Sequence, residues 1–473
     1  MPEGFVMTVP QIIMLVTLLL MLTGRVPLYL TAFTGSTIAA AMAFPWTRPI
    51  LTEGGAAVTT RVEGLLNGEV VRAFSQTVIT YPEGEAIVGV GRTVTGLLIG
   101  SLHPVILDMM GVLVFIGIME KAGFLNAIIV RIMQFGEKVG RGPGVCTAGG
   151  IAAGMIGGLT GFTQPAITAV ITGPPAIELG VDKDKVAGVI AHAGHLGNFG
   201  GITHPTIVAV VATTQLRFEW FGWGWINVIG AIVALSIFWC SYVRMTRSMK
   251  KEHGDVPAAV SGAIDKLVAE SGISFKKAIT PFVVLIIGFV AGFPIAAVGV
   301  GSALLVVAMT SWDFFAGEKA MLEGLSRITV PIFATVSFMY MSGVIAAVGL
   351  TTVVTNALGV YLEAYPILIM FIVGSIAGLI TQSNGASAAI VIPVLTIVLQ
   401  MPGVHPLTAA VAAAGGPAIM QYYLTGGPVA ALATVIPVIP GSDLKLANRF
   451  QRPSILFGML VLGIITAALS VIL

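Results

Sequence analysis

The stretch that decides the fold is GGLTGFTQPAIT, residues 157–168, which interrupts an apolar run with glycines, threonines and an amide before a proline. Non-helical backbone at membrane depth is tolerated only where it is buried in protein or lines a watery cavity. Gly161 allows the chain to reverse, and Pro165 suits the first turn of a new helix. The stretch therefore predicts a turn between two helices that lines a cavity.

The composition of the whole chain is that of a membrane protein. Of its 473 residues, 56% are apolar and 10% are charged, whereas a soluble domain carries about 25% charged residues. The formal net charge of +2 gives no basic face for nucleic acid. Cys146 and Cys240 both lie in apolar stretches, so neither disulfides nor a cysteine metal cluster is expected. We predict an integral membrane protein with no nucleic-acid partner, no metal centre and no cofactor other than a coupling ion.

Many apolar runs approach the roughly 20 residues that cross a bilayer. They cover residues 9–23, 27–45, 104–119, 143–158, 222–243, 278–293, 295–311, 328–348, 366–381 and 454–472. Shorter apolar pieces, broken by glycine, proline and amides, lie at 166–179, 186–196, 207–211, 388–399, 407–414 and 429–439. Short, interrupted segments at matching places in two halves are typical of a transporter's binding site. We predict an all-α integral membrane protein with about 10–12 transmembrane helices, including broken helices and re-entrant hairpins.

Two polar segments divide the chain. The segment 244–277 holds seven Lys or Arg residues against four Asp or Glu residues, so the positive-inside rule predicts a cytoplasmic loop. The segment 53–92 mixes charged and apolar residues and is either an amphipathic interfacial segment or an external loop. The expected organisation is N-terminal helices and a polar loop (1–103), a first repeat (104–243), the cytoplasmic loop (244–277) and a second repeat (278–473).

The two halves share four features in the same order. TQP at 163–165 aligns with TQS at 381–383, and the same offset places Pro175 on Pro393. Upstream, EKAGF at 120–124 corresponds to AAVGL at 346–350, and downstream the glycine-rich turn 194–205 corresponds to 415–428. We expect two inverted repeats, which require an odd number of membrane crossings between equivalent points.

The two matching turns are the predicted binding site. A helix that starts at Pro165 presents free backbone N–H groups and a positive dipole end, which suit a carboxylate. In the second turn Ser383 and Asn384 are natural N-caps and Gly385 frees the backbone. A packing bend is the alternative interpretation of each turn. The predicted binding residues are Thr160, Gly161, Thr163, Gln164, Thr168, Asn198, Thr203, Gln382, Ser383, Asn384, Gly385, Ser387 and Thr425.

Carbonyl groups exposed in the turns at Thr163 and Asn384 are an alternative site for Na⁺. Tyr422 and Tyr423, at the end of an apolar run, either line the substrate path or pack at the interface. The sequence does not choose between these interpretations.

Three histidines and one acidic residue are candidates for proton coupling. His192, His195 and His204 surround the first glycine-rich turn, and an imidazole takes up and releases a proton near neutral pH. Asp108 lies in an apolar run, where a carboxylate is a functional hypothesis by default. Interhelical hydrogen bonding by neutral groups is the alternative interpretation. A zinc site is not expected, because no His-Glu-x-x-His motif is present.

The motif GFxxPAIT at 161–168, followed by Leu179-Gly180, resembles the lactate permease family within the ion transporter superfamily. Residues 120–124, the Gly385 turn, SDL at 442–444 and RF at 449–450 support this resemblance. It implies a secondary transporter with two inverted repeats, each holding a re-entrant hairpin. Relatives carry small organic anions with H⁺ or Na⁺, often as homodimers that move a transport domain like an elevator. Gly157 stands where an acidic residue is expected, and the chain is shorter than usual, so related carriers stay open as alternatives.

The function that this resemblance implies is H⁺-coupled symport of a small organic anion, a 2-hydroxy-monocarboxylate such as lactate or glycolate. The main alternative is a Na⁺-coupled dicarboxylate, citrate or gluconate carrier, and a channel or an intramembrane enzyme is less favoured. We expect no enzyme activity, because a catalytic metal motif is missing and the chain is a two-fold repeat. The expected location is the cell (inner) membrane, as a multi-pass protein in contact with lipid.

Overall fold

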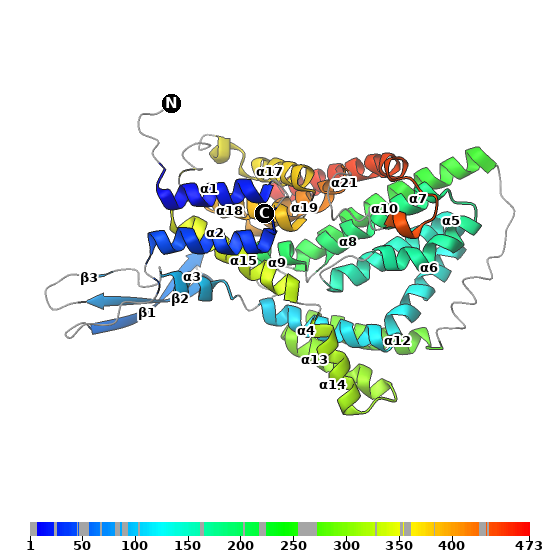
Figure 1. Ribbon diagram of the computed structural model, residues 1–473, viewed down its shortest axis with the longest axis horizontal. Coiled ribbons are helices and arrows are strands. Elements are labelled where there is room, and N and C mark those ends of the chain that lie inside the picture. Colours follow the sequence, from blue (N-terminus) through cyan, green and yellow to red (C-terminus); the bar gives the residue numbers. More distant parts are fainter. Residues whose placement is uncertain are drawn as a thin grey trace.

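The apolar runs of the sequence form helices, and the predicted helical membrane fold with broken helices is confirmed (Figure 1). The computed structural model describes residues 7–22, 26–44, 46, 56–66, 69–80, 86–87, 93–102, 105–160, 165–201, 204–216, 224–253, 272–326, 329–350, 353, 361–382, 384–424, 432 and 435–473.

The helices of the first half are α1 (Val9–Leu22), α2 (Leu28–Ala43), α3 (Val94–Gly100), α4 (Val105–Lys121), α5 (Phe124–Thr160), α6 (Pro165–Glu178), α7 (Lys183–Ala191), α8 (Ala193–Gly200), α9 (Pro205–Thr214) and α10 (Gly224–His253). Those of the second half are α12 (Phe275–Val290), α13 (Ile295–Met309), α14 (Phe314–Ser326), α15 (Thr329–Ala347), α17 (Pro366–Thr381), α18 (Asn384–Val398), α19 (Pro406–Met420), the 3₁₀ turn η2 (Ile436–Val438) and α21 (Leu444–Ile472).

Few of these helices are long enough to cross a membrane without a break. Among the described residues, Gly224–Lys251 and Leu444–Ile472 meet that length and apolarity. A third span results if Met110–Lys121 and Phe124–Gly158, which meet at a bend of 76°, are counted as one. Other apolar helices, such as α13, α17 and α19, have 10–17 residues. Of these, α19 falls on a predicted short piece, whereas α13 and α17 fall on runs predicted as full spans.

One segment departs from the all-α prediction. Residues 53–92, expected to be an interfacial segment or an external loop, contain an antiparallel sheet of β1 (Ala56–Leu66), β2 (Glu69–Thr80) and β3 (Ala86–Ile87) in the order β1-β2-β3. Valine and threonine recur through both long strands, and such β-branched residues favour extended backbone. Because charged and apolar residues are mixed in this segment, its strand pattern was not recognised from the sequence.

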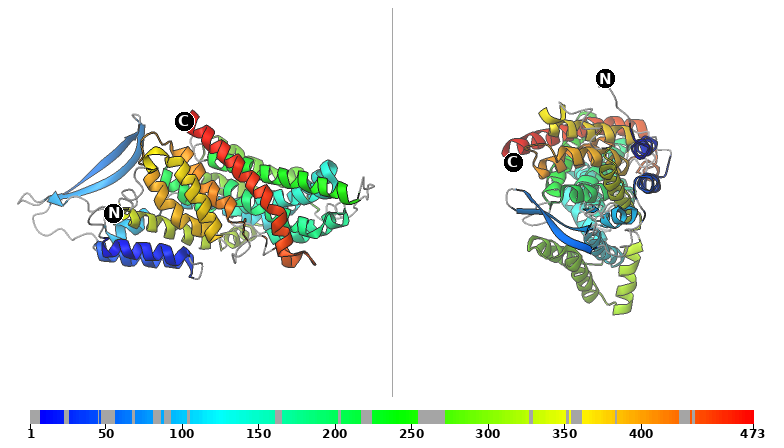
Figure 2. Two further views of the ribbon diagram at one scale, coloured as in Figure 1. Left: turned by 90° about the horizontal axis from the view of Figure 1, so that it is seen from above. Right: turned by 90° about the vertical axis from the view of Figure 1, so that its left-hand side faces the viewer.

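The helices form two packed groups. In the first, α17 packs along α19, α10 lies beside α21, and α5 contacts both α6 and α8 (Figures 1 and 2). In the second, α4 packs against α13 and α14. The backbones of α4 and α13 approach so closely that a Cβ at Gly111 or Gly299 would overlap the other helix. Such small-residue crossings are typical of membrane helix pairs.

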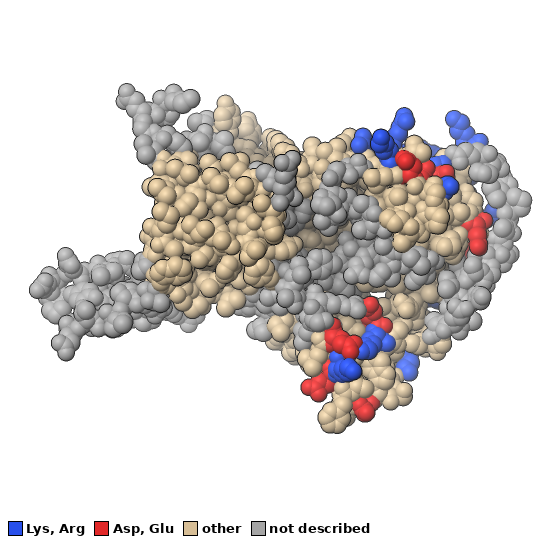
Figure 3. Space-filling model, viewed as in Figure 1, with Lys and Arg blue, Asp and Glu red and all other residues tan. Residues whose placement is uncertain are grey.

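Charged side chains are concentrated in two places. On the face shown in Figure 3 they gather where α7 begins and α10 ends, and again around α14, while the surface over α1 and α2 carries none among the coloured residues. Arg244 and Arg247 lie near the end of α10, where the segment predicted to be a cytoplasmic loop begins.

Candidate functional site

The turn between α17 and α18 is built by an unusual backbone conformation. α17 ends at Thr381, Gln382 has a left-handed backbone with φ of 49°, and α18 begins at Asn384. A non-glycine residue in this region costs about 1–3 kcal/mol and is found preferentially at functional sites. Gln382 therefore reverses the chain, whereas Gly385, to which we assigned that freedom, lies inside α18.

Asn384 joins three helices at this turn. Its backbone N–H donates to Oε1 of Gln421, at the end of α19, over 2.9 Å. Its side-chain Nδ2 lies 3.2 Å from Nδ1 of His204 and 3.5 Å from the carbonyl of Asn198. The hydroxyl of Thr206, in the first turn of α9, donates to the Asn384 carbonyl over 3.0 Å. The beginning of α18 is thereby fixed against the beginning of α9 and the end of α19.

The hydrogen bonds around His204 define its tautomer. The Thr206 N–H and Nδ2 of Asn384 both point to Nδ1 of His204, at 3.2 Å each. An amide N–H only donates, so Nδ1 is the acceptor and the ring proton lies on Nε2. His204 is therefore a neutral hydrogen-bonding group in this arrangement.

Two amide oxygens at the turn are buried without a partner among the described residues. They are Oδ1 of Asn384, a residue 3% exposed, and Oε1 of Gln382. Leaving a buried acceptor unpaired costs about 1–3 kcal/mol. Nearby, the hydroxyls of Thr381 and Ser387 lie 2.8 Å apart. The turn thus presents neutral oxygen atoms that a cation or a hydrogen-bond donor would satisfy.

Asn198 is connected to the end of α19 through Tyr422. Nδ2 of Asn198 donates to the Tyr422 hydroxyl over 2.6 Å, and the ring of His195 stands perpendicular to the tyrosine ring at 4.6 Å between centroids. A Cβ at Gly194 would overlap that hydroxyl, so the tyrosine occupies space that only a glycine leaves free. The predicted Asn198 is thereby brought to the same region as Asn384.

His192 begins a chain of buried hydrogen bonds. Its Nε2 lies 2.8 Å from the Ser241 hydroxyl, which donates to the hydroxyl of Ser454 over 2.7 Å. Because Ser241 donates onward, it accepts from Nε2–H of His192, and Nδ1 of that ring is left without a partner. Arg244 donates to Ser454 and to the carbonyl of Phe450.

His195 has the opposite tautomer. Its Nδ1 lies 3.3 Å from the carbonyl of Ala418 and must donate to it, so Nε2 is an unpartnered acceptor. The rings of His192 and His195 are 5.3 Å apart. Both rings are buried, and each carries one ring proton in the neutral tautomer that its hydrogen bond defines.

Several predicted site residues cannot be compared with these contacts. Gly161, Thr163, Gln164, Thr203, Ser383 and Thr425 lie outside the described residues. Thr160 is the last residue of α5, Thr168 lies on α6 and Asp108 lies on α4. The side chains of these three residues lie outside what the structure describes. α6 does begin at Pro165, as predicted.

The sequence interpretation missed two residues of this region and undervalued a third. Thr206 and Gln421 bond to Asn384 but were not among the predicted binding residues, and Tyr422 was left between two interpretations. The available signal was the polar QYY sequence at 421–423 after an apolar run of fourteen residues rich in alanine and glycine. Within the described residues, no group of three or more His, Cys, Asp or Glu side chains is placed to hold a metal ion.

Comparison with known proteins identifies the fold. No family model matches this chain, and no curated protein matches it. MtrF of Neisseria gonorrhoeae, described as illuminating a class of antimetabolite efflux pumps, is similar over 97% of this chain and 94% of its own, with 13% identity and a TM-score of 0.57. The YdaH transporter of Alcanivorax borkumensis, described as having an unusual topology, is similar over 98% of both chains, with 14% identity and a TM-score of 0.51. The chain therefore has the fold of these membrane transporters, and neither structure is a lactate permease.

Proposed function

We propose that this protein is a secondary active transporter of a small organic anion, which binds at the turn between α17 and α18. The observation that carries the proposal is the pair of buried, unpartnered amide oxygens of Gln382 and Asn384 at the beginning of a helix. The positive end of the α18 dipole attracts a carboxylate, and the amide oxygens accept from a hydroxyl or bind a cation. The fold shared with two transporters supports the same proposal.

The substrate we propose is a 2-hydroxy-monocarboxylate such as lactate or glycolate. The described side chains that meet at Asn384 are amides, hydroxyls and a neutral imidazole. A single carboxylate can be held by a helix dipole and neutral donors, whereas dicarboxylates and citrate require more positive charge to offset their desolvation. A hydroxyl next to the carboxylate would donate to one of the unpartnered oxygens.

For the coupling ion, the geometry favours Na⁺ over the H⁺ expected from the resemblance. Neutral amide and hydroxyl oxygens suit Na⁺ in a broken-helix turn. His192 and His195 are buried, and each already holds one ring proton in a neutral tautomer. Proton coupling is the second candidate, since Nδ1 of His192 and Nε2 of His195 are buried acceptors without partners.

Transport in proteoliposomes tests these proposals. Radiolabelled lactate uptake is measured with a Na⁺ gradient or a pH gradient imposed separately, and with unlabelled glycolate, gluconate, C4-dicarboxylates and citrate as competitors. We expect saturable uptake that requires Na⁺ and is inhibited by glycolate. Uptake driven by the pH gradient alone would indicate proton coupling through the histidines. Absence of both uptake and competition would refute the proposal that the substrate is a monocarboxylate. Flux that neither saturates nor shows counter-flow would identify a channel.

Two variants test the binding turns at matched expression. Asn384→Ala and Thr163→Ala are expected to weaken uptake, whereas Ser302→Ala on α13 removes a buried, unpartnered hydroxyl outside the site and should leave uptake unchanged. Unchanged transport in both turn variants would contradict the site. Preloaded vesicles test the direction of transport, because the class of proteins that MtrF illuminates consists of efflux pumps. Location in the inner membrane, the homodimer and elevator movement are proposals that follow from the sequence resemblance.

A further inference from the structure

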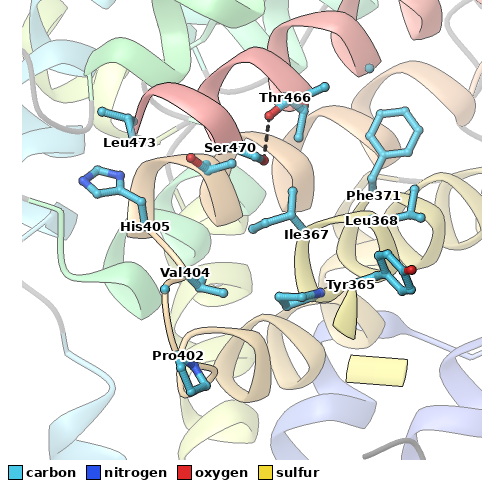
Figure 4. A pocket seen from close by; sticks show the side chains of 15 residues that line it. Tyr365, Ile367, Leu368, Phe371, Pro402, Val404, His405, Thr466, Ser470 and Leu473 are labelled. Carbon is cyan, nitrogen blue, oxygen red and sulfur yellow. Dashed lines mark hydrogen bonds between the residues drawn. The ribbon is translucent and has the colours of Figure 1, made fainter. Parts of the chain in front are cut away.

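A cavity lies away from the candidate site, between the beginning of α17, the loop before α19 and the last part of α21 (Figure 4). Its volume is about 490 Å³, within the range of roughly 300–1,000 Å³ that is usual for small-molecule sites. The transport proposal does not use this cavity. The level of the cavity in the membrane, the residues that line it and the surface around it together favour one kind of ligand.

The cavity lies at the membrane surface opposite the charged end of α10. α21 begins beside that end, because Arg244 contacts Phe450 and Ser454. From Arg452 to Ser470 the helix rises by about 27 Å, at 1.5 Å per residue. This is close to the hydrocarbon thickness of about 30 Å. Ser470 and the cavity beside it are therefore at the level of the opposite headgroups.

Most of the residues that line the cavity are apolar, and none of them has a charged side chain. The fifteen lining residues include no Lys, Arg, Asp or Glu. Leu368 and Phe371 form one wall, and Gly463 and Ala467 leave space on α21. In Figure 4, Phe371 and Leu368 lie on the side of the cavity opposite His405. A long, uncharged hydrocarbon fits these walls.

Polar groups in the same lining have unused hydrogen-bonding capacity. The hydroxyls of Thr408 and Thr466, residues 1% and 4% exposed, are buried without a partner. Nδ1 of His405 accepts from the N–H of Leu407 over 3.3 Å, so Nε2 carries the ring proton and can donate. The His405 donor suits a ligand that has an acceptor oxygen at the end of its chain, such as an ester carbonyl.

The cavity is continuous with the lipid-facing surface. Leu368 lines it and is 53% exposed, and Ile372, Leu460 and Ile464 on the same two helices are also exposed. Large exposed apolar residues on membrane helices face acyl chains. An acyl chain therefore enters from the bilayer without crossing the aqueous phase.

We propose that this cavity binds one acyl chain of a bilayer phospholipid. The chain lies along Leu368, Phe371 and Ala467, and its ester carbonyl accepts from Nε2–H of His405. Such a lipid fixes the ends of α17, α19 and α21 relative to one another.

Photolabelling of the full chain in proteoliposomes tests the proposal without measuring transport. The probe is a phosphatidylcholine with a diazirine in one acyl chain, and labelled peptides are identified by mass spectrometry. We expect saturable labelling of residues 366–371 and 463–470, at several times the level on α1, whose exposed Ile12 and Leu19 report general lipid contact. Ala467→Leu, which fills the cavity, should reduce labelling of 366–371 to the α1 level.

The matched control is Ile464→Phe, which adds volume to an exposed position of the same helix and should leave this labelling unchanged. Labelling of 366–371 that equals that on α1, or that survives Ala467→Leu in a variant with wild-type thermal stability, would overturn the site. Competition by oleic acid but not by excess unlabelled phosphatidylcholine would overturn the phospholipid in favour of a free fatty acid.

Discussion

Asn384→Ala is the perturbation that most directly tests the α17–α18 turn. The substitution removes Oδ1, which is buried and unpartnered in the absence of ligand, together with the Nδ2 contacts to His204 and Asn198. If Oδ1 binds the coupling cation or the substrate hydroxyl, the variant loses about 1–3 kcal/mol of binding free energy. This corresponds to a weakening of roughly 5- to 150-fold.

The effect on folding is expected to be smaller. The two Nδ2 contacts, at 3.2 and 3.5 Å, are long, and each net hydrogen bond contributes about 0.5–1.5 kcal/mol to stability, but the substitution also removes the unpaired buried Oδ1, which offsets part of this loss. The Asn384 N–H bond to Gln421 uses the backbone N–H of residue 384 and persists in the variant. Binding should therefore change more than the thermal unfolding midpoint.

The assay measures half-saturating Na⁺ and half-saturating lactate for uptake, with the thermal stability of the same preparations. We expect one or both concentrations to rise by the stated factor in Asn384→Ala and neither to change in Ser302→Ala. Gln382→Ala should act in the same direction, because its Oε1 is the other unpartnered amide oxygen. A lowered stability with unchanged half-saturation would refute the reasoning and leave Asn384 with a structural role.

The remaining predictions concern packing and pH. Tyr422→Phe leaves Nδ2 of Asn198 without its 2.6 Å acceptor and should cost about 1–3 kcal/mol of stability, measured by thermal unfolding in detergent; an unchanged midpoint would contradict the importance of this bond. Gly299→Ala forces a Cβ into the backbone of α4 and should destabilise the protein by about 1–3 kcal/mol, whereas Gly301→Ala, with open space around it, should not; equal midpoints would argue against the tight crossing. Burial lowers the pKa of His405 below 6.5, so the unfolded chain binds this proton more readily; its contribution to stability is complete above that pH and is lost as the pH falls through the lowered pKa. His405→Asn, which retains an N-cap acceptor, should reduce the acid loss of stability, and an identical pH profile would contradict this assignment.

The helices could be predicted where the sequence is continuously apolar. The run 366–381 coincides with α17, and 295–311 differs from α13 by two residues at one end. Boundaries were less accurate where polar residues continue a helix. α10 extends to His253 within the predicted loop, and α21 begins at Leu444, ten residues before the apolar run. Helix continuation depends on backbone hydrogen bonds and capping, here by Asp443, and not on apolarity alone.

A long helix with an internal break was also difficult to predict. The run 143–158 is only the second part of α5, which begins at Phe124 and contains non-helical backbone at Gly140 and Arg141. The charged and glycine-containing residues before Pro143 concealed the first part, because they interrupt the apolar pattern. The broken helix was expected in kind, but its position depends on packing.

The sequence by itself determined that the chain folds within a membrane, that one helix begins at Pro165 and that another begins near Asn384. These features follow from local apolarity and from the conformational preferences of proline and small polar residues, which act over a few positions. Only the tertiary structure decided that Asn384 meets His204 and that Asn198 meets Tyr422, pairs separated by 180 and 224 residues. Such contacts depend on how helices far apart in the chain pack against one another, and the local pattern of each helix does not specify its neighbour.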